Sequence, residues 1–475
     1  MYIYPKPKIV DYNDDVFLIK ENTYLYVDEE FENEDFFELL CELWQNFTFS
    51  QSKLTIKKSP NLKGQACLCN EEKDIFASET PGEYEYTISV SKKDVSVSYD
   101  IPQGLIHAFT TLLQEIEFED GKALLQCGNI MDSPSVSFRG IHFCVFPETT
   151  LDFLKQNVRL AGFLKYTHVI LEFWGMLKYD AMESLAWDFA YTKDDIRPII
   201  KDAHAYGMEV IPMFNHLGHA SGSRAVHGRH VVLDQDPSKH TLFEPDGWTW
   251  CLSNPETKEL LRKVRKELIE LCGNSKYFHI GCDEADSLAT CRKCRKRDKA
   301  ELLAEYLLEI QEELSSEGIR PIIWADGFLK KGDYPEKYVS LGDEETCKVI
   351  DKLNKEFVMA DWQYEVYEAP VKSTDYIKSK GFDVILCPFH PQKNIEVLGQ
   401  YAQNNFGFLA TTWHLLHEKY SMIISGAYIS WCGEMETLKS KLSSVANILR
   451  KLSPSGGDFE KAGWHEKEES TAEIY

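Results

Sequence analysis

From about residue 137 to residue 413, short apolar segments alternate with longer amphipathic ones. Short apolar runs bounded by turn residues predict buried strands, whereas apolar positions recurring every three or four residues predict helices. The predicted strands cover residues 137–143, 167–173, 209–214, 277–281, 321–324, 357–362, 383–388 and 408–413. Eight strands alternating with helices favour an α/β fold, a (β/α)8 TIM barrel, over a doubly wound open sheet.

The predicted helices between these strands have clear boundaries. Residues 194–206 precede Gly207, residues 255–272 follow Asn254 and precede Gly273, and residues 299–316 precede a further glycine, Gly318. An asparagine cap accepts hydrogen bonds from free backbone N–H groups, and glycine tolerates positive φ at the carboxyl end. Pro255 at the first helical position fits the same pattern, since its missing N–H group has no partner there.

The first part of the chain has a different pattern. Residues 84–90 and 95–99 alternate apolar and polar positions around a polar turn, which predicts a hairpin, and residues 104–116 predict a helix. The turn-forming segment 132–134 marks a boundary. We therefore expect a smaller N-terminal α/β domain at residues 1–130, a catalytic barrel at residues 131–452 and a C-terminal tail at residues 453–475.

Composition and missing motifs exclude several classes of function. Lys and Arg number 52 and Asp and Glu 76, so the net charge of −24 disfavours nucleic acid and anionic membranes as partners. No apolar run is long enough to cross a bilayer, and no secretory leader is evident. Phosphate-binding glycine loops, HExxH and GxSxG are absent. An odd count of 13 cysteines, many in apolar runs, predicts reduced thiols and a cytoplasmic protein. A homodimer remains open.

Candidate chemistry gathers where the predicted strands end, which is where barrel enzymes carry their active sites. Acids, histidines and tryptophans predominate there. Aromatic walls with polar ends suit a sugar, whose ring faces are apolar and whose edges carry hydroxyl groups. The residues at these ends are His142, Glu172, Trp174, Asn215, His216, His219, Asp283, Glu284, Trp324, Asp326, Asp361, Trp362, Tyr364, His390, Trp413 and His414.

The most informative segment runs from Tyr277 to Glu284, where an apolar strand leads directly into two adjacent carboxylates. Neighbours on a regular strand point to opposite faces, so both can serve one site only if the strand ends near Asp283 and the chain turns. Two such close charges should raise one pKa, as an acid with a companion carboxylate requires. A solvated acidic strand end is the alternative interpretation.

This segment resembles glycoside hydrolase family 20, the β-N-acetylhexosaminidases, whose His-x-Gly-x-Asp-Glu motif stands here at residues 279–284. Further similar segments are residues 104–114, 130–134 with 138–140, 211–212 with 218–220, and 321–326. The resemblance covers roughly residues 80 to 435. It is closest to the hexosaminidase D-like, non-secreted branch.

The resemblance implies an exo-acting, retaining enzyme that uses substrate assistance without a cofactor. The substrate's 2-acetamido oxygen would attack C1 while Asp283 holds the acetamido N–H and Glu284 protonates the leaving oxygen, then activates water. Tyr364 would donate a hydrogen bond to the acetamido oxygen. Trp324, Trp362 and Trp413 would line the acetamido pocket and the sugar face, or pack in the core. His219 would lie beside Glu284, and Asp326 belongs to the similar fifth-strand region.

Two departures from the family pattern leave undecided which residues bind the sugar's 3-, 4- and 6-hydroxyls. Residues 144–148 lack the family's sugar-binding arginine, while Arg139 is expected to be structural. Trp174 and Gly175 replace the acid pair usual after the second strand; Glu172 and His142 are the candidate substitutes. GlcNAc, GalNAc and modified sugars all remain open. So do a narrower β-N-acetylgalactosaminidase and a catalytically silent barrel that binds glycans.

Cys291 and Cys294 form a CxxC pair shortly after the acidic pair. Such a pair can hold half of a zinc site. No second strong Cys/His pair lies nearby in the sequence, although Cys251, Cys282 and His279 exist. The two alternatives are a zinc site completed by distant residues and free thiols on a basic loop.

Overall fold

The computed structural model describes residues 3–77, 84–221, 231–273, 275–413, 420–435 and 442–452. The chain divides into two compact units, one formed by Met1–Ser133 with Thr437–Tyr475 and the other by Pro134–Glu436. The expected tail at residues 453–475 lies outside the described residues.

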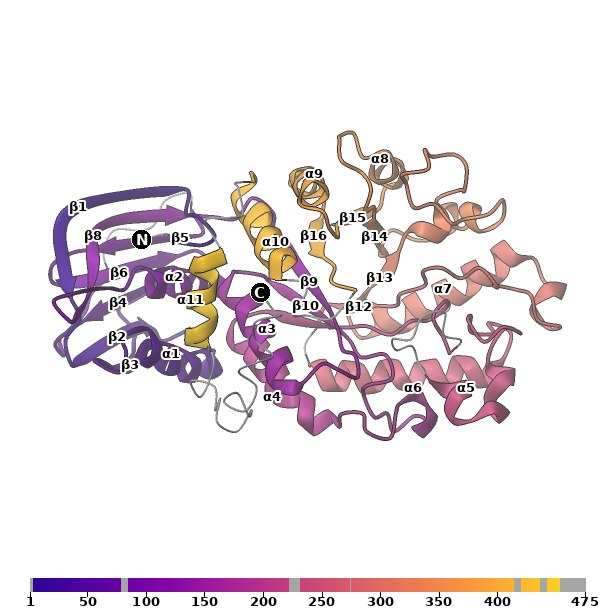
Figure 1. Cartoon of the computed structure of the whole chain (residues 1–475), viewed down its shortest axis with the longest axis horizontal. Coiled ribbons are helices and arrows are strands. Elements are labelled where there is room, and N and C mark those ends of the chain that lie inside the picture. Colours follow the sequence, from indigo (N-terminus) through magenta and orange to yellow (C-terminus); the bar gives the residue numbers. More distant parts are fainter. Residues whose placement is uncertain are drawn as a thin grey trace, which may run out of the picture. The chain divides into compact units, whose positions relative to one another are not determined.

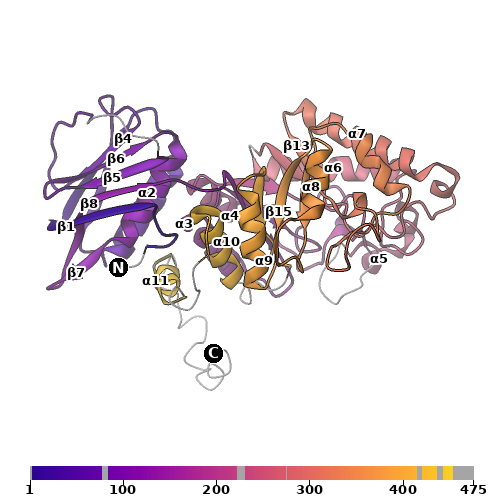
Figure 2. The same cartoon turned by 90° about the horizontal axis from the view of Figure 1, so that it is seen from above.

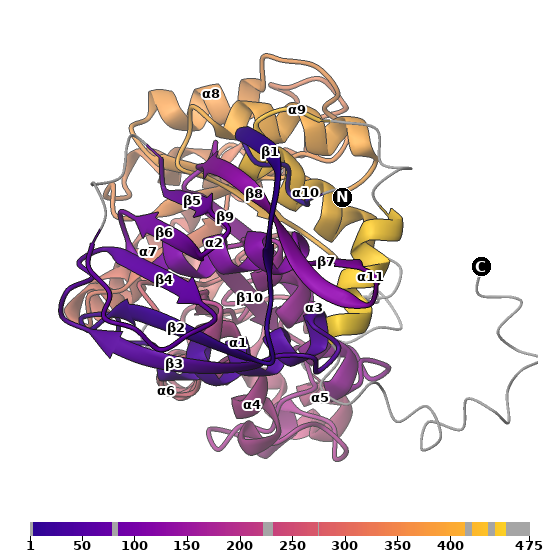
Figure 3. The ribbon, with the colours of Figure 1, turned by 90° about the vertical axis from the view of Figure 1, so that its left-hand side faces the viewer.

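The first unit is built on one mixed sheet with strands in the order β1-β8-β5-β6-β4-β2-β3, while β7 pairs with β8. Figure 3 shows this sheet, and Figure 2 shows α2 against one of its faces. The predicted hairpin is β5 and β6, and the predicted helix is α2. The elements are β1 (Ile9–Leu18), β2 (Asn22–Asp28), α1 (Glu34–Phe47), β3 (Lys53–Ser59), β4 (Gln65–Cys69), β5 (Tyr86–Val90), β6 (Asp94–Tyr99), α2 (Pro102–Gln114), β7 (Glu117–Glu119) and β8 (Lys122–Asp132).

The last helix, α11 (Leu442–Leu452), belongs to this first unit rather than to the barrel domain in which we had expected it. The reason is its packing against α1. The Asn46 side chain donates a hydrogen bond to the Lys451 carbonyl at 2.9 Å, and the Lys451 ammonium lies 4.3 Å from the centre of the Phe47 ring. The chain thus returns to the first unit after completing the barrel.

The second unit is the predicted barrel. Its eight strands are parallel, in the order β11-β10-β9-β16-β15-β14-β13-β12, and a parallel bridge between Met213 and His279 joins the two ends of that order. All eight predicted strands are present. They are β9 (Phe138–Cys144), β10 (His168–Glu172), β11 (Glu209–Pro212), β12 (Tyr277–His279), β13 (Arg320–Trp324), β14 (Val358–Trp362), β15 (Asp383–Cys387) and β16 (Gly407–Ala410).

Helices surround this barrel (Figure 1). They are α3 (Leu151–Phe163), α4 (Lys193–Ala205), α5 (Val232–Gln235), α6 (Pro255–Cys272), α7 (Lys299–Ser316), α8 (Lys372–Ser379), α9 (Gln392–Ala402) and α10 (Tyr420–Cys432). The short 3-10 turns are η1 (Glu183–Leu185), η2 (Pro237–Leu242), η3 (Cys294–Lys296), η4 (Asp326–Phe328) and η5 (Thr346–Asp351).

The boundaries of α6 are the predicted ones, and the predicted caps explain them. The Asn254 side chain accepts a hydrogen bond from the Glu256 N–H group, and Gly273 ends the helix with φ +77°. Among the described residues, no helix combines the length and apolar character needed to cross a bilayer.

Candidate active site

The acidic pair lies just beyond β12, on a sharply turned segment. The strand ends at His279, and φ is +65° at Gly281, +76° at Cys282 and +49° at Glu284. These left-handed conformations interrupt the alternation of a strand, as we expected the pair to require. Asp283 and Glu284 can therefore face the same site.

His279 and Gly281 hold this turn in place. The Gly281 N–H group donates a hydrogen bond to Nδ1 of His279 at 3.0 Å. Burial lowers the pKa of His279 to about 3, which keeps the ring neutral and Nδ1 available as an acceptor. A Cβ atom on Gly281 would lie 1.9 Å from Oδ1 of Asn215, so only glycine fits there. The histidine and glycine of the motif thus shape the backbone that carries the acids.

His219 connects the two carboxylates. Its Nε2 atom lies 2.9 Å from Oδ2 of Asp283 and 3.6 Å from Oε2 of Glu284. The His219 loop approaches the pair closely, because a Cβ on Gly218 would lie 2.0 Å from the Asp283 carbonyl oxygen. The Asp283 side chain is only 10% exposed, whereas the Glu284 side chain is 37% exposed. The two carboxylates differ in their access to solvent.

The Asp326 carboxylate holds the backbone of Glu284 in place. One carboxylate oxygen accepts the Glu284 N–H group at 3.0 Å, and the other accepts Nε1–H of Trp362 at 3.1 Å. Burial, together with the neighbouring charge of Asp283, raises the pKa of Asp326 to about 7. We predicted Asp326 among the sugar-binding residues, and that stays a prediction; in the structure its two oxygens accept hydrogen bonds from Glu284 and Trp362.

Trp248 is a part of the site that sequence reasoning missed. Its Nε1–H group donates to the Glu284 carbonyl at 2.7 Å, and its ring centre lies 4.4 Å from that of His219. Trp248 lies in the long connection between β11 and α6, away from any strand end. One feature of the sequence could have identified it. Trp248 is an aromatic residue within the polar segment Pro245–Thr249, which belongs to a connection at the carboxyl end of the barrel.

Aromatic side chains form a wall beside the pair. Trp324 is only 1% exposed and packs in the barrel core, with its ring centre 4.3 Å from His279 and 5.5 Å from Trp413. Trp362 and Trp413 are partly buried and pack against that core. Nε1–H of Trp413 donates to the Tyr364 hydroxyl, and burial raises the pKa of that hydroxyl well above its usual value. Trp362, Tyr364 and Trp413 are therefore partly exposed to solvent, whereas Trp324 is buried.

His142 and Glu172 lie on β9 and β10 and pair with one another. Nε2 of His142 lies 3.0 Å from Oε2 of Glu172, whose other oxygen accepts Nδ2–H of Asn215 at 2.7 Å. Both side chains are buried, and the His142 ring lies 4.6 Å from that of Trp413. Both Glu172 oxygens and Nε2 of His142 therefore have protein partners, while Nδ1 of His142 has none among the described residues. Their role in sugar recognition stays a prediction.

The other strand-end candidates have structural surroundings. Asp361 accepts hydrogen bonds from Gln363, Ser373 and Thr374, and the Trp174 ring packs edge-on against His219. Nδ1 of His216 lies 2.6 Å from the Phe214 carbonyl oxygen, and His390 packs on Phe389. Arg139 donates to the carbonyls of Val136, Ser137 and Lys165, in agreement with the structural role expected for it. His414 lies outside the described residues.

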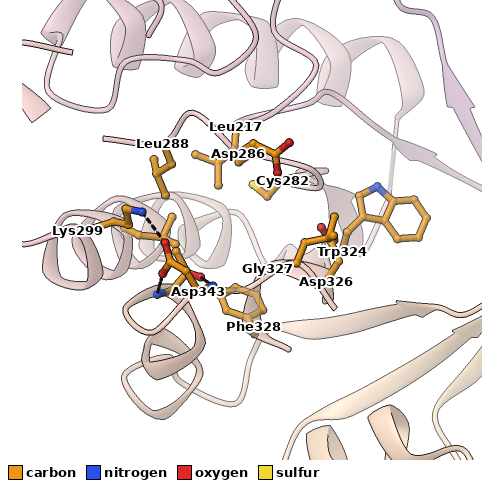
Figure 4. Close-up of a pocket in the computed structure, with 14 residues that line it drawn as sticks. Leu217, Cys282, Asp286, Leu288, Lys299, Trp324, Asp326, Gly327, Phe328 and Asp343 are labelled. Carbon is orange, nitrogen blue, oxygen red and sulfur yellow. Dashed lines mark hydrogen bonds and ion pairs between the residues drawn. The ribbon is translucent and has the colours of Figure 1, made fainter. Parts of the chain in front are cut away.

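A cavity of about 190 Å³ borders the segment that follows the pair. Trp324 and Asp326 contribute to its lining, but neither Asp283 nor Glu284 does. Figure 4 shows the Lys299–Asp343 ion pair on its opposite side, with an N···O distance of 2.5 Å. We therefore do not place the reacting sugar in this cavity.

Two groups of side chains among the described residues have the composition and spacing of metal ligands. One is His142, Cys144 and Glu172; the other is Glu244, Cys251, Cys291 and Cys294. The first group is the buried His142–Glu172 pair together with Cys144. The second group brings Cys291 and Cys294 together with residues 40 or more positions earlier in the chain.

Two models of one protein family together match most of the chain. The model for the catalytic domain of glycosyl hydrolase family 20 matches residues 169–395, and the model for domain 2 of that family matches residues 1–133. The chain belongs to glycosyl hydrolase family 20. The two matched segments correspond to the barrel and to the mixed sheet, and the acidic pair lies within the catalytic match.

Family 20 relatives are distant in sequence. Lacto-N-biosidase of Bifidobacterium bifidum is 21% identical over 52% of this chain and 23% of its own length. Beta-hexosaminidase 1 of Coccidioides posadasii is 26% identical over 42% of this chain and 37% of its own. The chain thus spans less than half the length of these curated relatives.

A solved family 20 structure shares the fold. The exo β-N-acetylglucosaminidase of Vibrio harveyi, solved in complex with N-acetylglucosamine, superimposes with a TM-score of 0.69 at 16% identity. The superposition covers 96% of this chain and 77% of that one. At this level of identity the likeness concerns the architecture.

Proposed function

We propose that this protein is an exo-acting, retaining β-N-acetylhexosaminidase that removes terminal β-linked GlcNAc or GalNAc by substrate-assisted catalysis. One observation carries the proposal: a buried and a partly exposed carboxylate lie 2.9 and 3.6 Å from the same imidazole nitrogen, at the carboxyl end of the barrel. Two carboxylates in different surroundings suit two different tasks.

Asp283 is the carboxylate that handles the acetamido group. When it accepts a hydrogen bond from the acetamido N–H, the acetamido oxygen becomes more nucleophilic and attacks C1. The C1–O bond to the leaving group breaks as the new C1–O bond forms, which produces a cyclic oxazolinium ion. In this proposal the Tyr364 hydroxyl donates a hydrogen bond to that acetamido oxygen; the raised pKa of the hydroxyl, which burial causes, supports the role because the group keeps its proton.

Glu284 is the proton carrier. In the first step it donates its proton to the glycosidic oxygen, and the aglycone leaves as an alcohol. In the second step the resulting carboxylate removes a proton from water, which attacks C1 and reopens the ring. Two inversions at C1 give net retention. The partial exposure of Glu284 supports this role because the carboxylate must reach both a departing aglycone and incoming water.

The N-acetylglucosamine bound in the Vibrio harveyi structure and the partly buried Trp362 and Trp413 of this chain support a terminal N-acetylhexosamine as the substrate. A narrower β-N-acetylgalactosaminidase is the second candidate. It stays a candidate because the chain lacks an arginine at residues 144–148 and because His142 and Glu172 are paired with one another. Other residues must therefore distinguish GlcNAc from GalNAc, which differ in the configuration of the 4-hydroxyl.

We also propose that the protein belongs to the hexosaminidase D-like branch and works in the cytoplasm. None of the thirteen cysteines, all of which lie in the described residues, forms a disulfide, which suits a reducing compartment. Fractionation of cells that produce the tagged protein tests this, and recovery only from the secreted fraction would contradict it.

Matched aryl β-GlcNAc and β-GalNAc substrates, with and without a thiazoline mimic of the oxazolinium ion, test the proposal. We expect turnover of at least one substrate and competitive inhibition by the thiazoline. Turnover that millimolar thiazoline leaves unchanged would contradict substrate assistance. Sugar binding without any turnover would instead support a glycan-binding barrel, an outcome that the partial exposure of Glu284 argues against.

A further inference from the structure

Four potential metal ligands meet in a loop cluster outside the acidic pair. Glu244 and Cys251 come from the connection between β11 and α6, while Cys291 and Cys294 come from the connection between β12 and α7. One ligand atom from each residue lies within 4.8 Å of all the others. We propose that these four residues bind a structural zinc ion.

The spacing of the sulfur atoms fits a tetrahedral ion. The Cys251 sulfur lies 3.6 Å from that of Cys291 and 3.6 Å from that of Cys294. Zinc–sulfur bonds of about 2.3 Å place two sulfurs of a tetrahedron about 3.8 Å apart. A disulfide requires a sulfur–sulfur distance of about 2.05 Å, so the thiols have the spacing of co-ligands rather than of a bonded pair.

Glu244 provides an independent indication of a bound cation. This carboxylate is only 1% exposed. Its Oε2 atom accepts hydrogen bonds from the Cys291 N–H group at 2.5 Å and from the Thr290 hydroxyl at 3.2 Å. Its Oε1 atom is buried without a hydrogen-bond partner among the described residues. A buried carboxylate oxygen without a donor is costly, and a metal ion beside it would remove that cost.

The surrounding backbone already has the form of a closed site. The Cys294 N–H group lies 3.3 Å from the Cys291 sulfur, and the Cys294 sulfur lies 3.2 Å from the Ser253 hydroxyl. Contacts of this kind orient the ligands of metal sites. Three thiolates and one carboxylate select zinc over calcium or magnesium, and four protein ligands leave no position for a substrate.

The two connections joined by this ion are the ones that carry Trp248 and Glu284. Ser287 already bridges them by hydrogen bonds of 2.8 Å to Thr249 and to Asp246. Trp248 in turn holds the Glu284 carbonyl. Zinc at this cluster would therefore fix the loop pair that supports the acidic residue, without taking part in the reaction.

Zinc content, measured by mass spectrometry of elements on the full chain, tests the proposal. The chain is purified under reducing conditions, then reconstituted with Zn²⁺ and passed through a desalting column. We expect about one zinc per chain in the wild type and in the control Cys347→Ser, whose thiol lies elsewhere. The variant Cys291→Ser/Cys294→Ser should retain less than about a tenth of that amount. Equal zinc in this variant, or no zinc in the reconstituted wild type, would overturn the proposal.

Substitution with Co²⁺ tests the ligand set in wild-type chain, so it does not depend on how a variant folds. We expect the intense visible bands of tetrahedral, thiolate-bound cobalt, displaced by added Zn²⁺. Weak octahedral bands would overturn the assignment. Glu244→Gln should keep the thiolate bands but bind the ion at least tenfold more weakly. Neither readout uses hydrolysis, so failure of the proposed function would leave this test intact.

Discussion

The two sides of the candidate site differ in where their polar groups point. On the β12 side, Glu284 is partly exposed and is held by Asp326 and Trp248 through its backbone. On the β9 and β10 side, His142 and Glu172 are buried and bonded to one another. The open side thus presents a partly exposed carboxylate, while on the closed side the carboxylate is buried and paired within the protein. In the proposed function, the open side carries the reaction, and the groups that recognise the sugar's 3-, 4- and 6-hydroxyls stay unassigned.

Substitution of the acidic pair should have the largest effect on the rate of hydrolysis. Glu284→Gln should lower kcat by roughly 10²–10⁴-fold, because the amide cannot transfer a proton. Asp283→Asn should disable oxazolinium formation to a similar extent. Steady-state rates on an aryl substrate check both. Wild-type rates in both variants would remove the acidic pair from the mechanism.

Asp326→Asn tests the support beneath Glu284. An amide offers one acceptor where Asp326 accepts both the Glu284 N–H and the Trp362 Nε1–H. Loss of one such buried hydrogen bond costs about 1.5–3 kcal/mol, which corresponds to roughly a 10–100-fold lower kcat/KM. The rate should fall without loss of zinc from the cluster at Glu244. An unchanged kcat/KM would mean that the acid is positioned by other groups.

Glu172→Gln tests the closed side. It weakens the contact with His142 and the hydrogen bond from Asn215, so we expect a loss of about 1–3 kcal/mol in the free energy of unfolding. The kcat value should stay within about tenfold of the wild type because Glu172 does not touch the reacting atoms. Denaturant unfolding and steady-state kinetics measure the two effects. A loss of kcat as large as that of Glu284→Gln would contradict the distinction between the two sides.

The smallest expected effect concerns pH. The pKa of Asp326 is raised to about 7, so in the folded protein it keeps a proton that the unfolded chain has already lost above about pH 4. Its contribution to stability therefore declines as the pH rises toward about 7. The Tm of the wild type, relative to that of Asp326→Asn, should decrease between about pH 5 and pH 8. Parallel Tm curves would contradict the raised pKa.

Much of the barrel follows from local patterns. Apolar strand segments, the Asn254 cap and Gly273 are determined by neighbours within a few residues, so the eight strands and the bounds of α6 could be predicted. The turn after β12 is equally local, because His279 accepts a hydrogen bond from Gly281 only two residues away. This is why the position of the acidic pair could be identified before its geometry.

Other features depend on contacts between distant segments. Trp248 meets Glu284 across 36 positions, Asp326 meets it across 42, and α11 packs on α1 from the far end of the chain. No local preference encodes such a meeting, since it exists only once the barrel closes and brings its loops together. The sequence alone located the motif that contains Glu284. That Asp326 accepts the Glu284 N–H group, and that Glu244 and Cys251 lie beside Cys291 and Cys294, depends on the tertiary structure.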